Sequence, residues 1–142
     1  MVIVLLIILD QAIKYFAYQS RPMEVLIPRW LEVRYTENTG TAFGFAEGQN
    51  TTLIVLSICI LLLFTIIFYL TTQRYDKIRF CWKAVLAGGI SNVLDRIFRG
   101  FVVDYIFINP FGICNLADFM VVLGAIGLIF QTLMVIGTDS KV

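Results

Sequence analysis

Histidine is missing from the sequence, and its absence excludes several kinds of site at once. A chain without histidine has no Ser-His or Cys-His nucleophilic system and no His-x-x-x-His metal site. The 3 cysteines, Cys59, Cys81 and Cys114, lie far apart along the chain, and two of them stand in apolar runs. This spacing favours neither a disulfide framework nor a metal cluster. We therefore expect the protein to work without a metal or any other cofactor.

Charge is scarce as well. Charged residues make up only 15% of the 142 residues, whereas hydrophobic residues make up 59%. This balance is typical of an integral membrane protein. The net charge is +1 and the basic residues are scattered, so that no run of them follows a phosphate backbone and we expect no nucleic-acid partner. The length allows one domain with about four spans of roughly 20 residues each.

Apolar segments predict where these spans lie. Residues 53–70 form the clearest span, since they carry no charge. Residues 80–98 are apolar but include several polar side chains, so that one side of this helix should face protein or water. We predict a single integral membrane domain over residues 1–142, a mainly α, four-transmembrane-helix bundle with spans at about 1–18, 53–70, 80–98 and 119–137.

Two segments in the connections have the pattern of β-strands. Residues 31–36 alternate with a period of two, and residues 102–108 are rich in branched and aromatic side chains. They belong to the connections 19–52 and 99–118, which lie on the same side of the membrane if there are four spans. We expect the two strands to pair into a small extracytoplasmic β-sheet next to the helix ends.

Lysine and arginine crowd in the short loop between the second and third spans, at Arg74, Lys77 and Arg79. Lys141 follows the fourth span. Because cytoplasmic loops are enriched in these residues, we expect this loop and both termini to be cytoplasmic. The two longer connections then face the outside.

Two acids, Asp104 and Asp118, bracket a short polar stretch at the edge of the apolar segments. A carboxylate close to hydrocarbon is costly unless it is paired, hydrated or protonated, so this placement indicates a functional site. Two carboxyl groups that share one proton supply a base and an acid. We predict that the two carboxyl groups lie within roughly 3 to 5 Å of each other, directly or through a water.

Further polar residues recur at helical spacing. Gly88, Asn92, Asp95, Arg96 and Arg99 follow one another at intervals of three or four residues, which places them along one face of the third span. In the first span, Asp10 precedes Lys14 by one helical turn. Such residues also join helices to one another in membrane proteins, and this alternative stays open at this point.

The order and spacing of these residues resemble the motifs of lipoprotein signal peptidase, the type II signal peptidase of bacteria. Any one block is weak evidence, but the blocks together, from residue 10 to residue 118, are specific. They are Asp10-Gln11-x-x-Lys14, Asn38-Thr39-Gly40-Thr41-Ala42-Phe43-Gly44, Gly88-Gly89-x-x-Asn92-x-x-Asp95-Arg96, Gly100-x-Val102-Val103-Asp104-Tyr105 and Asn115-x-Ala117-Asp118.

The resemblance implies a membrane aspartic endopeptidase that removes the signal peptide from diacylglyceryl-modified prolipoproteins. It also implies that Asp104 and Asp118 are the catalytic acids. The polar motif residues are expected to hold the substrate or orient the acids, and we assign them as substrate-binding (Asn38, Asn92, Arg96, Asn115) and supporting (Asp10, Lys14, Gly88, Gly89). Asp95 is expected to be a structural acid that bonds to neighbouring backbone or a cation.

The implied setting is the bacterial cytoplasmic (inner) membrane, with the active site at its extracytoplasmic face. The expected partners are the lipid-modified prolipoprotein and membrane lipids, and we expect a monomer. A substrate with two acyl chains presents its scissile bond near headgroup depth, where water is available. Trp30, Phe43 and Phe45 are candidates for a cradle or lid around the peptide, or else for interfacial anchors.

One residue departs from the family pattern near the acids. Cys114 stands where the family usually has phenylalanine, which changes the apolar wall beside the pair. Two other functions stay open, a small proton-coupled transporter and a noncatalytic membrane scaffold that binds lipidated peptides. The clustering of the acids at one surface, rather than along a relay through the bilayer, disfavours the transporter.

Overall fold

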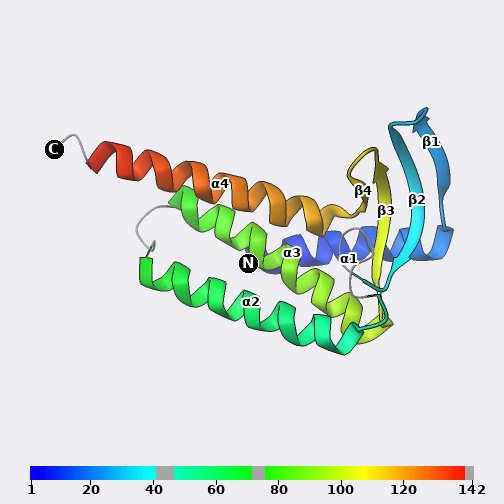
Figure 1. The fold of residues 1–142 in the computed structure, drawn as a ribbon, viewed down its shortest axis with the longest axis horizontal. Helices are drawn as coiled ribbons and strands as arrows, with labels where there is room; N and C mark the ends of the chain where they lie inside the picture. The colour runs from blue at the N-terminus through cyan, green and yellow to red at the C-terminus, as the bar shows by residue number, and fades with distance from the viewer. Residues whose placement is uncertain (41–46, 72–75, 140–142) are drawn as a thin grey trace.

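The computed structural model describes residues 1–40, 47–71 and 76–139. Its helices α2, α3 and α4 run side by side, and a small sheet stands at one end of them (Figure 1). In chain order the elements are α1 (Val2–Ser20), β1 (Met23–Ile27), β2 (Leu31–Asn38), α2 (Asn50–Thr71), α3 (Asp76–Arg99), β3 (Val102–Ile108), β4 (Gly112–Cys114) and α4 (Leu116–Asp139).

Among the described residues, 3 helices are long and apolar enough to cross a membrane, namely α1, α2 and α4. Most of the apolar side chains on α2 point away from the protein, as Leu62 does at 59% exposure and Leu63 at 58%. Such exposure is unfavourable in water but natural for a helix surrounded by lipid. The chain is therefore a mainly helical membrane protein with a small antiparallel sheet.

Helix α3 occupies the position predicted for the third span, but it is not one of these apolar helices. It packs against α1, α2 and α4, so that its polar side chains meet protein rather than lipid. The prediction that one side of this segment faces protein is confirmed. Two members of the stripe that the spacing indicated, Asp95 and Arg96, are buried at these contacts, and so is Ser91, which the stripe did not include.

The fourth helix begins earlier than predicted. It starts at Leu116 rather than at 119, so that Asp118 lies in its first turn and not in the connection before it. The reason is local: Asn115 precedes the helix and its side chain accepts the backbone N–H of Asp118 at 3.0 Å. A side-chain oxygen in this position satisfies one of the backbone donors that a helix start leaves without a partner.

The sheet has the strand order β1-β2-β3-β4, and every neighbouring pair is antiparallel. The predicted pairing of the two strand segments is confirmed, with Asn38 opposite Val102 and Thr36 opposite Asp104. The sequence did not predict β1 or β4. Every residue of β1 is exposed, so its side chains show no alternation between buried and exposed positions, and β4 spans only 3 residues.

Two adjacent glycines of α3 have different surroundings. A Cβ on Gly88 would lie 2.3 Å from the backbone oxygen of Ala117, so α3 and the first turn of α4 approach too closely for any side chain there. A Cβ on Gly89 would instead meet the end of the flexible Leu61 side chain at 2.6 Å. Gly88 therefore sets the distance between α3 and the helix start that carries Asp118.

Candidate active site

The two acids that the sequence singled out come from different elements and meet at the sheet end of the helices. Asp104 lies on β3 and is only 2% exposed, and Asp118 lies half-buried in the first turn of α4. Asn115 connects them. Its side-chain amide donates to Asp104 Oδ1 at 2.6 Å, and its backbone N–H donates to Asp118 Oδ2 at 3.0 Å.

The contact between Asn115 and Asp118 is reciprocal. Because the backbone N–H of Asp118 also donates to Asn115 Oδ1, each residue accepts a hydrogen bond from the backbone of the other. This is the geometry of a capping box, in which the residue before the helix and the third residue of the helix satisfy each other. The start of α4 therefore fixes the position of Asp118.

Two further asparagines complete the hydrogen bonds to the acids. Asn38 on β2 donates to Asp104 Oδ2 at 2.8 Å, and Asn92 on α3 donates to Asp118 Oδ1 at 2.8 Å. All four carboxyl oxygens of the pair thus accept a hydrogen bond from an asparagine. Hydrogen bonds of this kind hold both side chains in place and favour their ionised form.

Arg96 lies one helical turn beyond Asn92 and is 8% exposed. One arm of its guanidinium donates to the backbone oxygen of Gly40. Its Nη1 atom is buried and has no hydrogen-bond partner among the described residues. The positive charge lies near enough to Asp104 and Asp118 to act on both. A buried donor without a partner costs free energy, so its presence beside the acids indicates a place for a ligand oxygen.

A buried ionic network lies behind the acids. Lys14 Nζ contacts Asp10 Oδ2 at 2.9 Å and Asp95 Oδ2 at 3.0 Å, and none of the three side chains is exposed. Asp10 also accepts the backbone N–H of Ala117 at 2.9 Å, and Asp95 accepts that of Val103 at 3.1 Å. The expected pair of Asp10 and Lys14 is confirmed, and the network joins α1 to α3, to β3 and to the start of α4.

Sequence reasoning missed other members of this network. Gln11 donates to Ser91 and Asp95, and Ser91 Oγ donates to Asp10 Oδ2 at 2.6 Å. Arg99, which the spacing placed on the same helix face as Asp95, pairs with that acid. Gln11 stands inside the first motif block and Ser91 directly precedes Asn92, so proximity to the motifs was the available signal. Asp95 has the backbone and cation partners expected of a structural acid.

The surroundings of Asp104 disfavour its ionised form. Burial raises the pKa of this carboxyl to about 6, the hydrogen bonds from Asn38 and Asn115 oppose the rise, and the charge of Asp118 adds to it. Burial likewise raises the pKa of the nearby Tyr105 hydroxyl to about 12 and that of the Cys114 thiol to about 11. A carboxyl group with such a pKa is protonated in part of the molecules near neutral pH and is able to act as an acid.

Several predicted residues do not contribute to this description. Thr41, Ala42, Phe43 and Gly44 of the second motif block lie outside the described residues, as does Phe45. The basic residues Arg74 and Lys141 also lie outside them. Trp30 is 62% exposed at the turn between β1 and β2.

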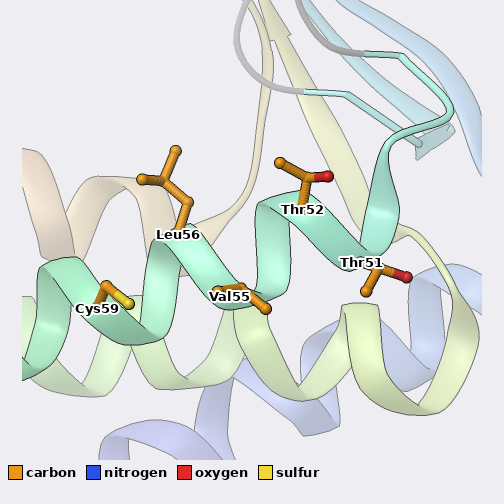
Figure 2. A pocket seen from close by; sticks show the side chains of 5 residues that line it. All are labelled: Thr51, Thr52, Val55, Leu56 and Cys59. Atoms are coloured by element: carbon orange, nitrogen blue, oxygen red, sulfur yellow. The ribbon is translucent and has the colours of Figure 1, made fainter.

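A shallow apolar hollow lies elsewhere, on the outer surface of α2 (Figure 2). Its lining comes from that helix alone and does not include the acids. The residues are Thr51, Thr52, Val55, Leu56 and Cys59. Exposed Val55 and Leu56 make it part of the apolar surface that α2 presents to its surroundings.

Comparison with known proteins agrees with the arrangement of the site. Residues 2–134 match the family model for signal peptidase (SPase) II. The chain belongs to the signal peptidase II family. The lipoprotein signal peptidase of Halothermothrix orenii is 32% identical over 87% of both chains, and that of Chlorobium phaeobacteroides strain BS1 is 36% identical over 85% of this chain and 86% of the relative.

Solved structures show the same fold. A bacterial membrane enzyme determined by the in meso method at 2.3 Å resolution superposes with a TM-score of 0.80 and 29% identity, covering 93% of this chain and 85% of that one. A second, at 1.9 Å resolution, gives a TM-score of 0.77 over 92% of this chain and 89% of that one. The predicted class of enzyme is therefore confirmed. This member of the signal peptidase II family is an aspartic endopeptidase, a hydrolase that cleaves prolipoprotein signal peptides, and neither the transporter nor the scaffold is needed.

Proposed function

We propose that Asp104 and Asp118 form the catalytic pair that cleaves the signal peptide from diacylglyceryl-modified prolipoproteins. The observation that carries this proposal is the position of Asn115, which hydrogen-bonds to both carboxyl groups at 2.6 and 3.0 Å. Through this single residue, acids from β3 and α4 meet at one site. A separation of about 3 to 5 Å between the carboxyl groups stays our prediction.

In this mechanism the two acids take different roles. Asp104, whose pKa is raised to about 6, carries the shared proton and gives it to the carbonyl oxygen of the scissile bond. Asp118 is more exposed than the buried Asp104, so it is the acid that water reaches, and it removes a proton from the attacking water. The water oxygen bonds to the carbonyl carbon and forms a tetrahedral intermediate. Asp118 then gives the proton it took from water to the leaving nitrogen, the C–N bond breaks, and the proton on the former carbonyl oxygen returns to Asp104.

The Nη1 atom of Arg96, which has no hydrogen-bond partner in the part of the chain that the structure describes, is the proposed contact for substrate. It is buried beside both acids, and its other arm is anchored on the Gly40 backbone oxygen. A carbonyl oxygen of the peptide, or the oxyanion that forms from it, would supply the missing acceptor. Asn38, Asn92 and Asn115 hold the acids and, in this proposal, line the same space.

The arrangement of the helices supports a membrane position for the site. The ends of α2 and α3 that face each other across the short connection lie far from the sheet (Figure 1). Arg79 and Lys83 belong to the α3 end of that connection, which makes it the cytoplasmic side by the distribution of positive charge. We propose that α3 crosses the bilayer together with α1, α2 and α4. Both termini would then be cytoplasmic, and the acids would lie at the extracytoplasmic face of the inner membrane, close to substrate headgroups.

We propose a monomeric enzyme. The direct test is incubation of the purified protein with a diacylglyceryl-modified precursor and with its unmodified twin. We expect cleavage of the modified precursor only, and loss of cleavage in Asp104→Asn and Asp118→Asn. Cleavage at the parental rate by either variant would refute the assignment of the pair, and equal cleavage of both precursors would refute the lipid requirement.

A further inference from the structure

The orientation of the Asn92 amide is decided by a residue that does not touch the acids. An asparagine side chain has an oxygen that only accepts and an NH2 group that only donates. Asn92 Nδ2 donates to Asp118 Oδ1 at 2.8 Å, and Asn92 Oδ1 accepts from Lys14 Nζ at 2.7 Å. The lysine ammonium is a donor with no acceptor capacity, so it accommodates only the oxygen end of the amide.

We propose that Lys14 is a positioning residue for the cleavage reaction, which acts by fixing the Asn92 amide so that its NH2 group donates to Asp118. A half-turn of the amide would bring its NH2 group against the ammonium and its oxygen against the carboxylate, so that both contacts become repulsive. This inference rests on the proposed role of Asp118 and deepens it.

The surroundings of Lys14 make it a rigid support. Its side chain is fully buried, and its three acceptors are Asp10 Oδ2 at 2.9 Å, Asp95 Oδ2 at 3.0 Å and Asn92 Oδ1 at 2.7 Å. An ammonium group has three N–H bonds, so these contacts use its whole donor capacity. The two carboxylates offset its charge, and the contact with Asn92 is the shortest of the three.

The other two asparagines are held differently. The backbone N–H of Gly40 donates to Asn38 Oδ1 at 3.0 Å, and the backbone N–H of Asp118 donates to Asn115 Oδ1 at 3.0 Å. In both cases a backbone donor turns the NH2 group toward an acid, and no side-chain substitution removes such a donor. Among these three amides, only Asn92 depends on a side chain for its orientation.

A second donor near Asn92 is weaker than Lys14. Asn115 Nδ2 lies 3.2 Å from Asn92 Oδ1, 3.4 Å from the Val103 backbone oxygen and 2.6 Å from Asp104 Oδ1, so its two N–H bonds are shared among three acceptors. It is also neutral, whereas hydrogen bonds from a charged donor are shorter and stronger. Asn115 alone would therefore hold the Asn92 amide only loosely.

The test measures kcat and KM of the purified enzyme on the diacylglyceryl-modified precursor, together with thermal unfolding. Lys14→Met removes the ammonium group that donates to Asn92, but it also leaves the carboxylates of Asp10 and Asp95 buried without this cation. The double variant Asp10→Asn/Lys14→Met removes one charge of each sign and serves as the charge-neutral version. We expect kcat to fall about 10- to 100-fold in both, the effect of losing one hydrogen bond to a charged group, with KM changed less than roughly twofold.

Combining the Lys14 variants with Asn92→Ala distinguishes a role of Lys14 in positioning Asn92 from a role in stabilising the buried network as a whole. If Lys14 acts through Asn92, adding Lys14→Met or the charge-neutral pair to Asn92→Ala lowers kcat no further. Parental kcat in the charge-neutral variant, or losses that multiply in the Asn92→Ala background, would overturn the inference. These results leave the proposed function intact as long as the parental protein cleaves the modified precursor and Asp118→Asn does not.

Ser91→Ala is the matched control. Ser91 Oγ donates to Asp10 Oδ2 at 2.6 Å within the same buried network, but it takes no part in orienting the Asn92 amide. We expect Ser91→Ala to lower the unfolding temperature while kcat stays within roughly twofold of the parental value. A fall in kcat equal to that of the Lys14 variants would show that loosening of the network is sufficient, and the inference would fail.

Discussion

Asn115 and Asp118 each accept a hydrogen bond from the backbone N–H of the other, at 3.0 Å in both directions. One member of the proposed catalytic pair is thus also part of the cap that starts α4. The acid is held by the geometry of the helix start rather than by its own flexible side chain. Substitutions at Asp118 should therefore affect helix stability as well as catalysis.

The first prediction separates these two effects. Asp118→Asn keeps an oxygen that accepts the Asn115 N–H, whereas Asp118→Ala does not. We expect both variants to lose at least about 10³-fold in kcat. Thermal unfolding should show Asp118→Ala to be less stable than Asp118→Asn by about 1 kcal/mol, the typical worth of one hydrogen bond. Equal stability of the two would argue against the capping role. Glu24→Gln on the exposed strand β1 is the control for a change of acid to amide.

The second prediction concerns stability against pH. The pKa of Asp104 rises from 3.8 to about 6 on folding, first because of burial. The folded protein therefore holds this proton more tightly than the unfolded chain, so the contribution of Asp104 to stability is complete below pH 3.8 and is lost as the pH rises through about 6. The measurement is thermal unfolding of the parental protein and of Asp104→Asn between these pH values.

Asp104→Asn has no such group to titrate, so its stability should fall less than that of the parental protein over the same range. Parallel curves for the two proteins would contradict the raised pKa. The same titration bears on the reaction, because an acid that has to be protonated becomes less available as the pH rises above its pKa.

Part of this arrangement was visible in the sequence. Apolar runs predicted the helices, and the four-residue spacing of Asp10 and Lys14 predicted their ion pair. These features are local, so that a few neighbouring residues are sufficient to determine them. The pairing of β2 with β3 is not local, and it was predicted by placing both strand segments on the same side of the membrane. The Asn-x-x-Asp pattern before an apolar run was also a helix-start signal, but it was interpreted only as a family motif.

The rest depends on contacts between distant segments. The path from Lys14 through Asn92 to Asp118 joins residues 78 and 26 positions apart, and no periodicity in the sequence encodes it. Strand β1 escaped prediction because all of its residues are exposed, so that no alternating burial marks it. The Nη1 donor of Arg96, without a partner among residues 1–40, 47–71 and 76–139, likewise emerges only from the three-dimensional surroundings.

The third prediction uses the two adjacent glycines of α3. In Gly88→Ala the new methyl group would meet the Ala117 backbone oxygen at 2.3 Å, so the first turn of α4 has to move and carry Asp118 with it. In Gly89→Ala the methyl group meets the end of the Leu61 side chain, which is able to rotate away. We expect a loss of about 1 to 3 kcal/mol in stability and a clear fall in kcat for Gly88→Ala.

Gly89→Ala is the matched control for this pair. Its clash is with a flexible side chain, and alanine gains about 1 kcal/mol over glycine inside a helix, so the net change should be small. Unfolding temperature and kcat are measured for both variants in the same detergent. Parental kcat in Gly88→Ala would show that the spacing of α3 and α4 does not determine the position of Asp118.

The last prediction concerns the unpartnered arm of Arg96. Lysine at this position keeps the positive charge near Asp104 and Asp118. It has a single nitrogen, however, and does not reproduce the guanidinium fork, in which one nitrogen contacts the Gly40 oxygen and another is directed at a substrate oxygen. We expect Arg96→Lys to lower kcat/KM by about 10- to 100-fold, as for one hydrogen bond to a charged group, and Arg96→Ala to lower it at least as much. Arg34→Lys, on the solvent side of β2 over the Phe107 ring, is the control and should leave kcat/KM unchanged. If Arg96→Lys also cleaves with parental kcat/KM, the charge alone is sufficient, and the unpartnered Nη1 does not bind the substrate.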